Sequence, residues 1–213
     1  MWIKVCGMTT DEAVEAALAA GVDAIGFVFA ESKRQVTPQR ASQLAAPARG
    51  KVRCIAVTRH PEQSAVDDII AIFNPDVLQT DIEDFRALNL PATLERLPVV
   101  RAGRTDNFDE RSGNSLPARL LFEGPVSGTG VPADWQAAHR LARRAELILA
   151  GGLSPENVAA AIAAVQPFGV DVSSGVESSP GVKSPERIAS FVRSARAAFR
   201  SLDTSVRAQE KAS

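Results

Sequence analysis

Two residues of this sequence carry side chains that could move protons during a reaction at carbon. Cys6 ends the short apolar segment Trp2–Cys6, and Glu123 directly follows Arg119-Leu120-Leu121-Phe122. A thiolate can remove a proton that is bound to carbon, and a carboxylic acid can donate one. The alternative for a cysteine in a strand is a small buried hydrophobic residue, which is how we interpret Cys54. The alternative for Glu123 is a surface carboxylate. If the fold brings Cys6 and Glu123 to one site, they form an acid–base pair.

Three later segments are rich in glycine and serine. They are Ser127–Gly130, Gly151-Gly152 and Ser173–Gly175. Backbone N–H groups in such loops can hold a phosphate, although glycines can also serve only to form tight turns. No Walker pattern is present, so a nucleoside triphosphate is not indicated. The two histidines, His60 and His139, are too isolated to suggest a metal site, and we predict none.

The elements that must position these residues alternate along the chain. Short apolar segments, typical of strands buried on both faces of a parallel sheet, are separated by Ala-rich stretches of helical period. The predicted strands are Trp2–Cys6, Asp23–Phe29, Val52–Val57, Asp76–Gln79, Leu97–Ala102, Arg119–Glu123, Leu147–Ala150 and Val170–Ser173. The predicted helices follow Thr10, Thr37, Pro61, Asp134, Ser154 and Ser184, with a weak one at Glu83–Glu95 and an irregular one at Asn107–Ser115.

Eight strand–helix units fit a TIM (β/α)8 barrel in a single domain. Residues 2–202 give about 25 residues for each unit, near the lower size limit of this α/β fold. A doubly wound sheet, the alternative, normally has five or six strands and would leave units over. We expect the barrel to span residues 1–202 and residues 203–213 to form a disordered polar tail. The carboxyl ends of the strands would then carry the site.

Composition limits the classes of partner. The chain has 24 basic and 25 acidic residues, so neither nucleic acid nor an anionic membrane surface is expected as its main partner. No apolar run reaches the length of roughly 18 residues that a membrane span requires, and no secretory signal is expected. Two cysteines suit free thiols in a reducing cytoplasm. The even charge mixture and few aromatic residues favour a monomer over a homodimer.

Five ordered motifs resemble those of the phosphoribosylanthranilate isomerases. They are Lys4-Val5-Cys6-Gly7-Met8-Thr9, Gly26–Phe29 with Ser32-Lys33-Arg34, Ser127–Gly130 with Asp134-Trp135, Gly151–Val158 and Val170–Glu177. Members of that family are single-domain TIM barrels of tryptophan biosynthesis. They convert N-(5-phosphoribosyl)anthranilate to 1-(2-carboxyphenylamino)-1-deoxyribulose 5-phosphate by an Amadori rearrangement, an aldose–ketose isomerisation that uses no metal or organic cofactor.

The resemblance implies a role for each matched residue. Cys6 would be the general base and Glu123 the general acid, while Arg34 would bind the anthranilate carboxylate and Asp171 would also contact substrate. The phosphate would be held by Gly128, Thr129, Gly130, Gly151, Gly152, Ser173, Ser174 and Gly175. The family usually has Asp at the position of Glu123, which makes Asp171 the next candidate for the acid.

Other departures and two other classes of function stay open. Gln79-Thr80-Asp81 replaces a common Gln-Leu-His-Gly, and Ser127 replaces a glycine. Another phosphosugar barrel enzyme, such as a ribulose-phosphate epimerase, would need metal-binding histidines that this chain lacks. A non-catalytic subunit that binds a phosphorylated ligand would fit the exchange to Glu123, but not the retained thiol.

Overall fold

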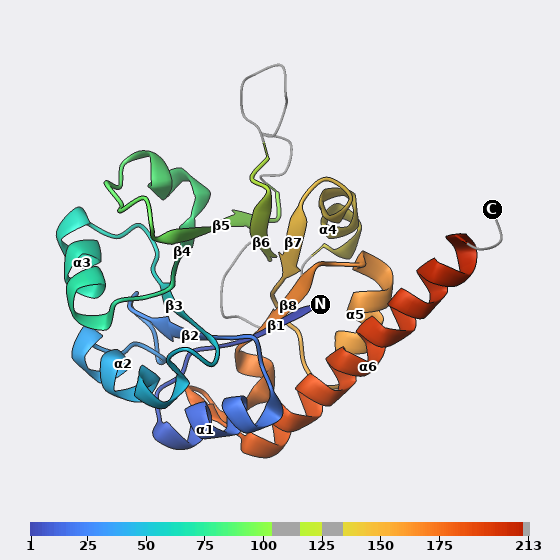
Figure 1. Cartoon of the computed structure of the whole chain (residues 1–213), viewed down its shortest axis with the longest axis horizontal. Coiled ribbons are helices and arrows are strands. Elements are labelled where there is room, and N and C mark those ends of the chain that lie inside the picture. The colour runs from blue at the N-terminus through green and yellow to red at the C-terminus, as the bar shows by residue number, and fades with distance from the viewer. Residues whose placement is uncertain (104–115, 125–133, 211–213) are drawn as a thin grey trace.

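The protein forms a closed barrel of eight parallel strands surrounded by helices (Figure 1). The structure is a computed structural model, and it describes residues 1–103, 116–124 and 134–210. The strands are β1 Trp2–Cys6, β2 Ala24–Val28, β3 Arg53–Val57, β4 Val77–Asp81, β5 Glu95–Arg101, β6 Arg119–Glu123, β7 Glu146–Leu149 and β8 Gly169–Val172. All eight predicted strands are present, and the prediction of a single-domain TIM barrel is confirmed.

The helices cover the outside of the barrel. They are α1 Asp11–Ala20, α2 Pro38–Ala45, α3 Gln63–Asp68, α4 Trp135–Ala142, α5 Val158–Val165 and α6 Pro185–Glu210. A π-helical turn, Ile69–Phe73, continues α3. The hydroxyls of Thr10 and Thr37 and the carboxylate of Asp134 accept hydrogen bonds at the starts of α1, α2 and α4, as the capping patterns predict. α6 packs against both α1 and α5 and so closes the ring of helices (Figure 1).

Alternation along the strands divides the apolar side chains into two cores. Ile3 and Val5 of β1 belong to a large core between the sheet and the helices. A second core fills the barrel interior and includes Ala24, Ile55, Leu121 and Ile148. Inward positions nearer the carboxyl ends carry polar groups instead. The interior is therefore apolar at one end and polar at the end where the site is expected.

Several boundaries differ from the sequence-based prediction. The weak helix expected at Glu83–Glu95 is a short 3₁₀ helix, Ile82–Arg86, because Pro91 interrupts the segment and β5 already begins at Glu95. α5 begins at Val158, since Pro155 to Asn157 form turns. The irregular helix expected at Asn107–Ser115 lies outside the described residues.

The structure after β8 also differs from the prediction. A short hairpin, β9 Glu177–Ser179 and β10 Val182–Lys183, was not predicted and lies between β8 and α6. α6 continues to Glu210, so residues 203–210, which we expected to belong to a disordered tail, are helical. Among the described residues, no helix has the length and apolar character needed to cross a membrane.

Candidate active site

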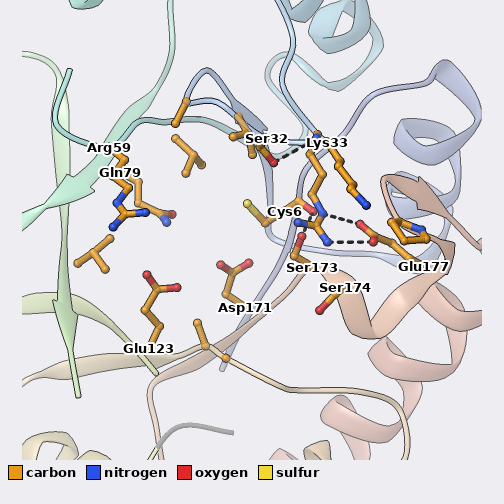
Figure 2. Close-up of a pocket in the computed structure, with 18 of the residues that line it drawn as sticks. Cys6, Ser32, Lys33, Arg59, Gln79, Glu123, Asp171, Ser173, Ser174 and Glu177 are labelled. Atoms are coloured by element: carbon orange, nitrogen blue, oxygen red, sulfur yellow. Dashed lines mark hydrogen bonds and ion pairs between the residues drawn. The ribbon is translucent and has the colours of Figure 1, made fainter. Parts of the chain in front are cut away.

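A cavity of about 740 Å³ opens at the carboxyl ends of the barrel strands. Each strand, or the loop that follows it, contributes to its wall. The lining includes Cys6 (β1), Arg34 (after β2), Arg59 (after β3), Gln79 (β4), Arg101 (β5), Glu123 (β6), Gly151 (after β7) and Asp171 (β8). Figure 2 shows Cys6, Glu123 and Asp171 pointing into the same space. The barrel therefore brings the predicted acid–base pair to one site.

Cys6 ends β1 with its thiol facing the barrel interior. Its neighbour across the sheet is Gly26 of β2. A β-carbon at Gly26 would lie 2.9 Å from Cys6 Sγ and 3.0 Å from Lys4 Cε, so the absent side chain leaves the room that both groups occupy. Burial raises the pKa of the Cys6 thiol. The ammonium groups of Lys4 and Lys183 lower it, and the carboxylate of Asp171 adds to the increase.

Asp171 lies beside the thiol on β8, the strand that closes the barrel against β1. Its Oδ2 accepts a hydrogen bond of 2.8 Å from the Nζ of the fully buried Lys4. Its Oδ1 is also buried, and no atom of the described residues forms a hydrogen bond with it. Burial raises the pKa of Asp171, and the Lys4 ammonium opposes this increase. Because an unpaired buried acceptor is costly, Oδ1 is suited to accept a hydrogen bond from a ligand.

Glu123 belongs to a network of charged side chains on the opposite wall. Arg101 donates through Nη1 to Glu123 Oε1 at 2.5 Å and through Nη2 to Asp81 Oδ1 at 2.7 Å. Burial lowers the pKa of Arg101, but the two carboxylates outweigh this effect and the pKa is raised. Strands β4, β5 and β6 are adjacent, which places the three groups in a row. Arg101 therefore fixes the position of the Glu123 carboxylate.

Arg34 reaches the cavity from the loop after β2 and pairs with Glu177. Its Nε and Nη2 donate to the two carboxylate oxygens of Glu177 at 2.6 and 3.0 Å. Glu177 also accepts from Lys183 Nζ at 2.7 Å and from the backbone of Gly181. Burial raises the pKa of Glu177, but the hydrogen bonds from Arg34 and Lys183 prevail and bring it to about 2. Glu177 thus occupies one edge of the guanidinium.

Comparison with known proteins identifies the family of this chain. Residues 3–194 match the family model described as N-(5'phosphoribosyl)anthranilate (PRA) isomerase. The chain belongs to the phosphoribosylanthranilate isomerase family. A member from Roseiflexus sp. is 40% identical, and the match covers 92% of this chain and 98% of that protein.

Solved structures of the same family share the barrel. The phosphoribosylanthranilate isomerase of Thermotoga maritima superposes with a TM-score of 0.80 at 30% identity, covering 92% of this chain and 99% of that one. A second such structure, with a TM-score of 0.78 and the same identity and coverage, holds reduced 1-(o-carboxyphenylamino)-1-deoxyribulose 5-phosphate. The family predicted from the five sequence motifs is therefore confirmed.

Two of the three loops expected to bind phosphate in this isomerase family contribute to the wall of the cavity. Gly151, Gly152, Ser173 and Ser174 line it. Gly175 does not, because it packs against the loop after β7, where a β-carbon would lie 1.9 Å from the carbonyl oxygen of Leu153. Its glycine is therefore explained by the close approach of two loops. Gly128, Thr129 and Gly130, the third expected segment, lie outside the described residues.

Four further charged residues, for which the sequence suggested no role, lie in or beside the cavity. Lys4, Arg101, Glu177 and Lys183 each pair with a group in or beside the cavity. The signal for Lys4 and Arg101 is a charged residue at an inward position of a buried strand, where an unpaired charge would be unfavourable. Lys183 lies in the hairpin that was not predicted, so no pattern pointed to it.

A second group of ionisable residues lies beside Arg101. The ligand atoms of His60, Asp81 and Asp84 all lie within 4.8 Å of one another. His60 Nδ1 is 2.9 Å from Asp84 Oδ1, and His60 Nε2 is 3.3 Å from Asp81 Oδ2. Asp81 also binds the guanidinium of Arg101, and this contact compensates the charge of the Asp81 carboxylate. We interpret the group as a network of polar contacts that supports Arg101 through Asp81.

Proposed function

We propose that this chain converts N-(5'-phosphoribosyl)anthranilate to 1-(2-carboxyphenylamino)-1-deoxyribulose 5-phosphate in tryptophan biosynthesis, with Cys6 as the general base and Glu123 as the general acid. The observation that carries the proposal is that β1 and β6 direct a thiol and a carboxyl group into one cavity (Figure 2). Membership of the isomerase family supports the substrate and the reaction.

The first step requires a proton at the ring oxygen of the ribose. Glu123 donates it, the bond between carbon 1 and the ring oxygen breaks, and the nitrogen lone pair forms a Schiff base with carbon 1. Arg101 contacts both Glu123 and Asp81, so Asp81 still balances the guanidinium charge when Glu123 carries a proton. The contact with Arg101 also holds the longer Glu side chain in place of the usual Asp.

The second step removes a proton from carbon 2. The Cys6 thiolate takes this proton, and the electron pair of the carbon–hydrogen bond moves to give an enolamine and a neutral thiol. Tautomerisation then places a proton on carbon 1 and a carbonyl at carbon 2. Because carbon 1 is reduced as carbon 2 is oxidised, the reaction balances internally, and our proposal includes no cofactor and no metal.

Binding of the substrate uses both sides of the cavity. Arg34 binds the anthranilate carboxylate, with Glu177 holding the other edge of its guanidinium. Oδ1 of Asp171 accepts a hydrogen bond from a substrate donor, which removes an unpaired buried acceptor. The phosphate binds the backbone and hydroxyl groups of Gly151-Gly152 and Ser173-Ser174. Gly128, Thr129 and Gly130 form the third phosphate-binding segment. Gly175 allows the loop after β8 to approach the loop after β7.

A coupled assay with freshly prepared phosphoribosylanthranilate tests the proposal. We expect turnover by the parent chain and a loss of kcat of at least about 100-fold in Cys6→Ala and Glu123→Gln. Cys54→Ala is the matched control, because Cys54 is buried away from the cavity. Absence of turnover by the parent would contradict the enzyme function. Full kcat in Glu123→Gln would transfer the acid role to Asp171, which Asp171→Asn would then test.

The remaining properties extend the same proposal. We place the protein in the cytoplasm as a monomer, with residues 1–202 as its catalytic domain and a small-molecule substrate instead of nucleic acid or membrane as partner. Among the described residues, the large apolar side chains that are exposed are Met1, Ile72 and Val182, too scattered for an extended interface. Sedimentation equilibrium measures the mass, and a dimer at micromolar concentration would contradict the monomer.

A further inference from the structure

Lys4 is placed to act on the thiol of Cys6. The two residues are neighbours on the inward face of β1, and both side chains lie against Gly26. A β-carbon at Gly26 would lie 2.9 Å from Cys6 Sγ and 3.0 Å from Lys4 Cε. Lys4 is fully buried and its ammonium has three protons to donate. Lys4 Nζ donates a hydrogen bond to Asp171 Oδ2, and the interactions with Asp171 and with Cys6 both raise the pKa of Lys4.

We propose that Lys4 is a positioning residue that favours the thiolate form of Cys6 against the effect of burial and aims its sulfur at the substrate, so that the base acts through a Lys4–Cys6–Asp171 cluster. This inference rests on the proposed function for its meaning in catalysis, although the state of the thiol can be measured without substrate. Lys4 keeps its proton throughout, and the proton removed from carbon 2 goes to Sγ.

Charged groups of both signs surround the thiol of Cys6. Lys4 on β1, Lys183 on β10 and Arg34 after β2 are cationic, and Asp171 on β8 is the anionic group that faces the thiol. Lys183 is directed to Glu177 and to Ser173, and Arg34 is directed to Glu177, so their charges are largely compensated. Lys4 is also paired, with Asp171, but its Cε borders the same space over Gly26 as the Cys6 sulfur. Its removal should therefore disfavour the thiolate, whereas removal of Asp171 should favour it.

A purely structural ion pair would behave differently. If Lys4 and Asp171 served only to stabilise the barrel, loss of either partner would loosen the same part of β1 and β8. Both changes would then shift the reactivity of Cys6 in the same direction. Opposite shifts are the signature of an electrostatic action on the thiol.

The experiment measures the pH midpoint for alkylation of Cys6. The full chain is treated with iodoacetamide over a range of pH, and peptide mass spectrometry follows the reaction. We expect Lys4→Met to raise the midpoint by at least about one pH unit, which lowers the alkylation rate at neutral pH about tenfold. Asp171→Asn should lower the midpoint, and Lys4→Arg should keep it near the parent value. Lys51→Met, at an exposed lysine, is the matched control and should leave it unchanged.

Lys4→Met leaves Asp171 buried without a partner, so circular dichroism must confirm folding. If it fails to fold, the double variant Lys4→Met/Asp171→Asn is compared with Asp171→Asn, since both lack the carboxylate charge. A higher midpoint in the double variant supports the inference. Equal midpoints, or shifts of the same sign for Lys4→Met and Asp171→Asn, overturn it. Absence of turnover by the parent, with the opposite shifts intact, would contradict the proposed isomerase function alone.

Discussion

The ion pair between Arg34 and Glu177 makes a prediction that combines stability with pH. Glu177 is 5% exposed and has a pKa of about 2, against an ordinary value of about 4.3. A difference of this size corresponds to at most about 3 kcal/mol at neutral pH, and to about 2 kcal/mol once solvent in the adjoining cavity is considered. We expect Glu177→Gln to lower the free energy of unfolding at pH 7 by about this amount.

The contribution of Glu177 to the free energy of unfolding should decrease as the pH falls. Because the folded-state pKa is lowered, the stabilisation is complete above the unfolded value near 4.3 and is lost as the pH falls toward 2. Urea unfolding at pH 7 and at pH 3.5 measures it, and the difference between parent and variant should shrink by about 1 kcal/mol. Glu15→Gln, at an exposed position of α1, is the control. A difference that stays constant between the two pH values would refute the reasoning.

The remaining predictions concern substrate binding, the acid and the base. Arg34→Ala should raise KM by about 10- to 100-fold with a smaller effect on kcat, because a charge-assisted contact with the carboxylate is lost; an unchanged KM in steady-state assays would remove Arg34 from the substrate site. Arg101→Met should lower kcat more than it changes KM. It should also destabilise the fold by about 3 kcal/mol, because two carboxylates lose their shared cation. A variant with the kcat and the stability of the parent would contradict this prediction. Gly26→Ala should destabilise the chain by about 1–3 kcal/mol and reduce kcat, because its methyl group meets Cys6 Sγ; wild-type kcat would show that the thiol position is unimportant.

The fold was predictable because short apolar segments and helical stretches alternate along the chain, and each can be recognised from its own residues. Segments such as Val52–Val57 and Leu147–Ala150 are apolar and short, and the hydroxyl or carboxyl caps at Thr10, Thr37 and Asp134 mark helix starts. The strand boundaries were correct within two residues for this reason. The hairpin of β9 and β10 was missed because neither strand has a clear period, and its position depends on contacts with distant loops such as that of Thr9 to Gly181.

The site was predictable in its positions but not in its pairings. Cys6, Arg34, Glu123 and Asp171 could be placed at the cavity because the barrel orders the ends of its strands. Their partners depend on register and side-chain direction across the sheet, which a single sequence does not contain. The alignment of Lys4 with Asp171, for example, requires β1 and β8 to pair, and these residues are 167 positions apart.

Closure of the barrel therefore assembles the surroundings of Cys6, the proposed base, as well as the fold. The last strand supplies Asp171, and the Ser173 hydroxyl after it donates to the carbonyl oxygen of Cys6. Lys183, in the hairpin that follows β8, donates to the carbonyl of the same Ser173. The contacts of Asp171 with Lys4 and of Ser173 with Cys6 join the first strand of the chain to residues that follow 170, and Lys183 supports them through Ser173. A chain that ends before β8 would retain Cys6, Arg34, Glu123 and Lys4 but would lose Asp171 and Lys183, two of the charges that act on the thiol, so the proposed catalytic site depends on the complete barrel.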